Sequence, residues 1–209
     1  MLTIHATQKL YKKLTLDDQG CLAAENIPAT AHTQHANNNP LSGWHANIIR
    51  LQGCQCVLLV HDATRFPLFI KGLLKADLAS FDWHFADALM NTLLKLGAHQ
   101  HQLDTAAALL GPCQFDSDCN RSVQGTMNQM KGDIEHMLCY DDIKLAAVSN
   151  DRTAAWLADR PCTVKGIKGS IWPHKAMLAL LSQAIQPSEE PALADNVVQL
   201  AGYRDAKKP

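Results

Sequence analysis

Residues 44–70 read WHANIIRLQGCQCVLLVHDATRFPLFI, and they determine the kind of fold that the chain can adopt. They contain three apolar runs separated by two short segments, and the runs lie at 44–50, 54–60 and 66–70. Gly53 lies in the first separating segment, and two apolar runs around a glycine-containing turn are typical of a β-hairpin. Pro67 has no N–H to donate, which places the third run at the edge of a sheet. These residues therefore predict a small antiparallel β-meander, and an apolar stretch at 2–5 is a further strand candidate.

The sequence after the meander has the periodicity of helices. Between residues 77 and 96, leucine and phenylalanine recur at spacings of three and four, as on the apolar face of a helix. Further helices are expected at about 103–110, 121–138, 151–159 and 173–185. We therefore expect an α+β fold in which a small antiparallel β-meander packs against about five helices. The predicted domain covers 1–186 with a long loop insertion at 17–43, and 187–209 is expected to be a C-terminal tail.

Composition and charge exclude several classes of protein. The chain has 209 residues with 19 basic and 20 acidic side chains, so it lacks the bulk cationic surface of a typical nucleic-acid-binding protein. No apolar run reaches the ~20 residues that span a bilayer, and the pattern of a signal peptide is missing. We therefore expect a cytoplasmic protein without a membrane partner. Its seven cysteines have no Cys-x-x-Cys spacing and are expected to be reduced thiols, with no metal and no cofactor.

The segment 120–138 carries two rows of residues at helical spacing. One row is apolar and predicts an ordinary core face; it consists of Val123, Met127, Met130, Ile134 and Met137. The second row, on the opposite side of the helix, consists of Arg121, Gly125, Asn128 and Gly132. Each glycine inside a helix costs about 1 kcal/mol relative to alanine, so we expect another backbone or a ligand to approach this row closely.

The start of this helix has groups that suit an anion. Arg121 offers a planar set of donors for phosphate or carboxylate, and Ser122 and the free amides of the first turn add to them. We expect a small anionic, phosphate-type ligand here. The alternative is that the helix packs closely on the meander and that Arg121 pairs with an acidic neighbour such as Asp62.

Three motifs resemble those of an uncharacterised bacterial family, known as a domain of unknown function. They are WHANII at 44–49, VLLVHDATRF at 57–66 and NRSVQGTMN at 120–128, and the opening IHATQKL at 4–10 is similar as well. The resemblance extends over about 1–185 and brings no known activity. It implies that the polar residues of these motifs form one shared site. The ligand-binding candidates are therefore Asn47, Thr64, Arg65, Asn120, Arg121, Ser122, Gly125 and Asn128.

These features favour a non-catalytic cytosolic binding or regulatory protein with a small anion pocket. The alternative is an enzyme acting on a phosphate-containing substrate, hydrolase-like or nuclease-like, with His45 or His61 as the base. Such an enzyme should place one of these histidines within about 3–4 Å of Asp62 or Arg121 in a concave pocket. A third hypothesis is a nucleic-acid-associated factor that uses the basic loop at 165–175. The sequence leaves open whether the chain forms a homodimer.

Overall fold

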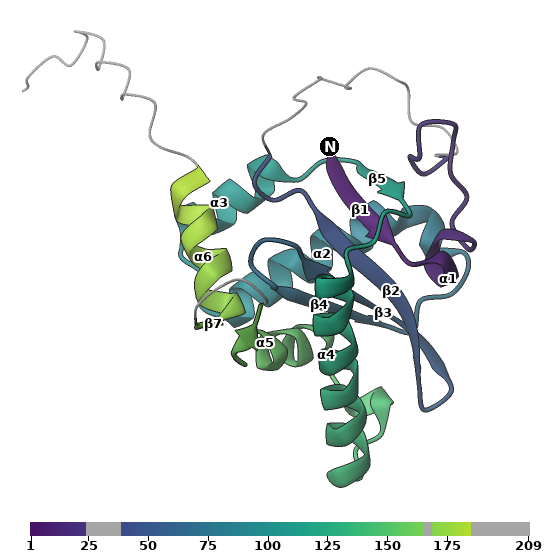
Figure 1. The fold of residues 1–209 in the computed structure, drawn as a ribbon, viewed down its shortest axis with the longest axis vertical. Coiled ribbons are helices and arrows are strands. Elements are labelled where there is room, and N and C mark those ends of the chain that lie inside the picture. The colour runs from purple at the N-terminus through teal and green to yellow at the C-terminus, as the bar shows by residue number, and fades with distance from the viewer. Residues whose placement is uncertain (24–38, 165–168, 185–209) are drawn as a thin grey trace, which may run out of the picture.

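A five-stranded mixed sheet forms the centre of the fold (Figure 1). The structure is a computed structural model that describes residues 1–23, 39–164 and 169–184. The strands are β1 (Leu2–Ala6), β2 (Trp44–Leu51), β3 (Cys54–His61), β4 (Pro67–Lys71) and β5 (Cys113–Asp116). They are arranged in the order β4-β3-β2-β1-β5, so β1 lies inside the sheet and β4 and β5 form its edges.

Strands β2, β3 and β4 form the antiparallel meander that the sequence predicts. The turn between β2 and β3 has positive φ at Gln52 (46°) and Gly53 (84°), as a tight two-residue hairpin turn requires. Pro67 begins the edge strand β4, where a missing N–H is tolerated.

The sheet is mixed, which corrects the expectation of a purely antiparallel meander. β1 pairs in parallel with β2 on one side and with β5 on the other. β5 has only four residues, of which Cys113 and Phe115 are buried, and so short a segment carries little periodicity. Because β1 and β5 run in parallel, their carboxyl ends lie at the same edge of the sheet.

Six α-helices lie within the described ranges, and they cover both faces of the sheet (Figure 1). They are α1 (Gln8–Tyr11), α2 (Phe81–Lys95), α3 (Gln100–Leu109), α4 (Arg121–Tyr140), α5 (Asn150–Ala158) and α6 (Pro173–Ala184). Short 3-10 turns occupy Asp77–Ser80 and Leu145–Ala147, and a small ribbon pairs β6 (Cys162–Thr163) with β7 (Ser170–Ile171). The helices expected after the meander are thus all present, and α1 is additional.

Alternating side chains of β3 enter two hydrophobic cores, one on each face of the sheet. Val57 and Leu59 pack in the core that α2, α3 and α6 complete. Leu58 and Val60 pack in the other core, against α4 and α5. Helix α4 enters this second core through its apolar row, as predicted, and this packing fixes the helix across the sheet.

Residues 17–23, the first part of the predicted loop, return to the sheet edge. Cys21 forms an isolated bridge with Gln114 of β5. Gly20 has a φ of +79°, and a Cβ there would lie 2.5 Å from the carbonyl oxygen of Phe115. The loop residues 24–38, the basic segment 165–168 and the predicted tail lie outside the described residues. In the part of the chain that is described, no helix has the length and apolar character to cross a membrane.

Candidate functional site

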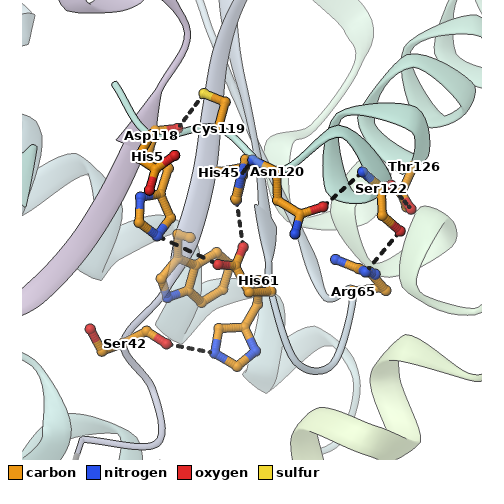
Figure 2. A network of polar contacts seen from close by, with 12 residues as sticks. His5, Ser42, His45, His61, Arg65, Asp118, Cys119, Asn120, Ser122 and Thr126 are labelled. Atoms are coloured by element: carbon orange, nitrogen blue, oxygen red, sulfur yellow. Dashed lines mark hydrogen bonds and ion pairs between the residues drawn. The ribbon is translucent and has the colours of Figure 1, made fainter. Parts of the chain in front are cut away.

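The first residues of α4 are tied to the sheet by a short chain of hydrogen bonds (Figure 2). Asn120 caps the helix, because its Oδ1 accepts a bond of 2.8 Å from the backbone N–H of Ser122. The backbone N–H of Asn120 donates to Nε2 of His45 at 2.6 Å. His45 lies on β2 and is 1% exposed, so the helix start rests on a buried side chain of the sheet.

His45 uses both of its ring nitrogens within the protein. Because Nε2 accepts from Asn120, the neutral ring carries its proton on Nδ1, which donates to Oδ1 of Asp62 at 2.5 Å. His45 and Asp62 therefore lie together, as the enzyme hypothesis expects. No lone pair of the ring remains free to take a proton from a substrate, however.

His61 is fully buried and is held neutral by its surroundings. Its Nε2 donates to the carbonyl oxygen of Ser42 at 3.2 Å, and its Nδ1 accepts from the hydroxyl of Thr64 at 2.8 Å. Burial lowers the pKa of His61 from 6.5 to about 4. The hydroxyl of Thr64 also accepts from the N–H of Phe66, so this candidate ligand residue serves the β3–β4 turn.

His5, which Figure 2 shows, and Asp116 join this cluster, and neither is among the site residues predicted from the sequence. They are register partners in the parallel pair of β1 and β5, and Nδ1 of His5 lies 2.7 Å from Oδ1 of Asp116. The other nitrogen of His5 faces Oδ2 of Asp62 at 3.6 Å. Asp62 thus lies between His5 and His45, whose ring centroids are 4.9 Å apart. Only a prediction of β5 and its register would have found this arrangement.

Arg65 places a buried cation beside the start of α4. It lies in the β3–β4 turn with a φ of 60°, and it is 6% exposed. Its Nη2 donates to Oγ of Ser122 at 3.3 Å, whereas the buried Nε and Nη1 have no hydrogen-bond partner among the described residues. Burial lowers the pKa of the guanidinium, and the negative charge of Asp62 acts in the opposite direction. None of the ion pairs formed within the described ranges includes Arg65.

The glycine row of α4 faces outward, so another backbone, the first of the two expected partners, does not approach it. Arg121, Gly125, Asn128 and Gly132 are all exposed. Apart from the neighbouring residues and backbone of α4 itself, no described atom comes within 4 Å of the place that a Cβ would take at either glycine. The pair of Arg121 with Asp62, which the alternative interpretation predicted, is not formed, and the carboxylate of Asp62 faces the two histidines. No other element of the described chain therefore packs against Gly125 or Gly132.

Asn47 lies in a different place from Arg65. Its Oδ1 accepts from the hydroxyl of Thr7 at 2.8 Å, and its side chain lines a groove together with Gln124. The structure therefore does not bring all of the candidate ligand residues together. Arg65 and Ser122 meet at the start of α4, and Asn47 lies in the groove.

The described residues contain no group of three or more histidine, cysteine or acidic side chains placed to hold a metal ion. All seven cysteines are free thiols.

A family model described as "Domain of unknown function (DUF6933)" matches residues 3–176. No curated protein and no solved structure matches the chain. The matched residues include all of the histidine and carboxylate cluster, Arg65 and the whole of α4.

Proposed function

The chain belongs to the DUF6933 family, a domain of unknown function, and from the geometry of its own residues we propose that it is a non-catalytic protein that binds a small oxyanion. The observation that carries the proposal is the guanidinium of Arg65, buried beside a helix start with two N–H nitrogens that have no partner in the described residues. Phosphate and sulfate are the simplest ligands with this chemistry.

A buried cation without acceptors destabilises a fold, and an anion would remove that cost. Leaving a buried donor without its acceptor costs about 1–3 kcal/mol, and more when the group is charged. The N-terminus of the 20-residue helix α4 adds partial positive charge at the same place. The carboxylate of Asp62 is directed at His5 and His45 rather than at Arg65. An oxyanion would supply acceptors to Nε and Nη1 and negative charge to the helix start.

The first turn of α4 adds further donors. The backbone amides of Arg121 and Val123 have no backbone acceptor in the described ranges, whereas the amide of Ser122 is occupied by the Asn120 side chain. Ser122 is exposed and its hydroxyl accepts from Arg65, so this residue connects the buried guanidinium with the surface at the helix start. A guanidinium, a hydroxyl and helix amides are donors that commonly surround bound phosphate.

The histidines support binding rather than catalysis. His45 and His61 direct both ring nitrogens at protein groups, so neither candidate base has a free nitrogen for the alternative function, an enzyme that acts on a phosphate-containing substrate. We include a cytoplasmic location in the proposal, because seven unpaired thiols are typical of a reducing compartment.

Thermal unfolding of the full chain with added phosphate or sulfate tests this proposal. At constant ionic strength, adjusted with sodium chloride, we expect the Tm of the wild type to rise with phosphate concentration. Arg65→Gln should lose this dependence on phosphate, whatever its Tm without ligand. Arg50→Gln removes an exposed arginine of β2 and should respond to phosphate like the wild type.

Arg121, the exposed arginine at the start of α4, provides a second control for the phosphate response. Arg121→Ala should retain most of the phosphate response, because Arg65 and the helix amides remain. The proposal is wrong if Arg65→Gln still responds to phosphate as the wild type does. It is also wrong if Arg121→Ala loses the response while Arg65→Gln retains it, since the anion would then bind at the exposed side chain.

A further inference from the structure

A groove of about 570 Å³ opens between the loops that follow β1 and β5. One side is formed by the start of α1, with a residue of β2 beside it, and the other by the segment that leads from β5 into α4. Its lining side chains include Gln8, Lys9, Asn47, Asp118, Cys119 and Gln124.

The groove lies where this topology favours ligand binding. β1 and β5 are parallel neighbours, so their carboxyl ends and the loops that follow them lie at one edge of the sheet. In open sheets with parallel strands, ligands bind in crevices at this edge. The volume falls within the range of small-molecule sites, about 300–1,000 Å³.

The lining of the groove is polar and its charges balance. Lys9 of α1 supplies one ammonium group, and Asp118, on the segment that follows β5, supplies one carboxylate. The remaining lining side chains are amides, hydroxyls and one thiol. Burial raises the pKa of the Cys119 thiol, so this group adds no charge near neutral pH. The lining has no hydrocarbon side chain for an apolar ligand and no excess of positive charge for a polyanion.

We infer that this groove binds a small zwitterion of the free amino-acid class. The ligand carboxylate would face Lys9 and the ligand ammonium group would face Asp118. The amides of Gln8, Asn47 and Gln124 would hydrogen-bond a polar side chain. Asn47 has donors to spare for this, because Thr7 occupies its Oδ1 and its amide hydrogens have no acceptor among the described residues. The site is separate from Arg65 and does not depend on the proposed oxyanion function.

An NMR titration of the full ¹⁵N-labelled chain with L-glutamine tests the inference. We expect saturable shifts of the backbone amides at 7–9 and 117–119. Acetate and methylamine, which carry the two charges on separate molecules, should each bind at least about tenfold more weakly, since neither can contact both charged side chains. The inference is overturned if glutamine binds no tighter than acetate or methylamine, or if the shifts lie elsewhere.

Charge-neutralising variants locate the contacts. Lys9→Gln and Asp118→Asn should each weaken glutamine binding about fivefold, as expected for one partly exposed ion pair. Lys144→Gln and Asp142→Asn alter exposed charges beyond the C-terminal end of α4 and should leave binding unchanged. The inference is contradicted if the Lys9 and Asp118 variants bind glutamine as tightly as these two control variants do. Arg65→Gln should retain glutamine binding, so failure of this site and failure of the oxyanion site give different results.

Discussion

Replacing His61 with glutamine should change how the free energy of unfolding depends on pH, because the fold holds this histidine uncharged. His61 is 0% exposed, and its ring nitrogens are hydrogen-bonded to Ser42 and Thr64. Glutamine keeps a polar group at this position but does not titrate.

The size of this change in the free energy of unfolding follows from the pKa of His61 in the folded and in the unfolded protein. Burial lowers this pKa from 6.5, the value taken for the unfolded chain, to about 4 in the folded protein. Between these pH values the unfolded chain binds a proton at His61 and the folded protein does not. The contribution of His61 to stability is therefore complete above about pH 6.5 and is lost as the pH falls towards about 4. At about 1.4 kcal/mol per pKa unit, the loss amounts to about 3 kcal/mol.

Urea unfolding of the wild type and of His61→Gln, measured between about pH 7.5 and about pH 4, tests this reasoning. We expect the variant to be less stable than the wild type at about pH 7.5. The difference between their free energies of unfolding should shrink by about 3 kcal/mol by about pH 4. Val57→Ala, a buried change in the same strand, should lower the free energy of unfolding nearly equally at every pH. Parallel curves for the wild type and His61→Gln would show that His61 is not held neutral and would refute the argument.

Four further substitutions test backbone and capping features by the same urea measurement. Gly20→Ala should lower the free energy of unfolding by more than about 2 kcal/mol, because the new Cβ would meet the carbonyl of Phe115. At Gly53 there is space for a Cβ, so Gly53→Ala should lower it by only about 1 kcal/mol, through the positive φ. Equal losses of unfolding free energy in Gly20→Ala and Gly53→Ala would contradict the clash between a Cβ at position 20 and Phe115. Asn120→Ala should cost about 1 kcal/mol by removing the side-chain cap of α4, and an unchanged midpoint would count against that role. Gly125→Ala should stabilise the protein by up to about 1 kcal/mol, and a loss would show that something packs on that face.

Local pattern in the sequence accounts for most of the fold. The alternation of apolar residues around Gly53 identifies the hairpin, and the rows of leucine, phenylalanine and methionine identify the long helices because each element buries one continuous face. The parallel strand β5 (Cys113–Asp116) carries no comparable signal, since four residues with two buried side chains occur in many loops. The mixed character of the sheet therefore depends on pairing between distant segments, which a local pattern does not encode.

The sequence predicts the positions of only some residues of the histidine and carboxylate cluster and of the helix start, and the reason is again that their contacts join distant segments. The sequence draws attention to the start of α4 and to Asp62, because their motifs carry polar residues between apolar runs. The capping role of Asn120 is seen only in the structure. The sequence does not rank Arg65 above Arg121, since which arginine is buried depends on how the β3–β4 turn meets α4. It also assigns a packing role to Gly125 that the exposed surface of α4 does not provide.

The interior position of β1 constrains the order in which the chain can fold during synthesis. His5 on β1 is separated by 111 positions from its register partner Asp116 on β5. One edge of β1, with the buried side chains of Leu2 and Ile4, lacks its neighbour until β5 has left the ribosome. Nascent chains that end before β5 expose an apolar strand edge, which is a template for aggregation, and translation of β5 removes it.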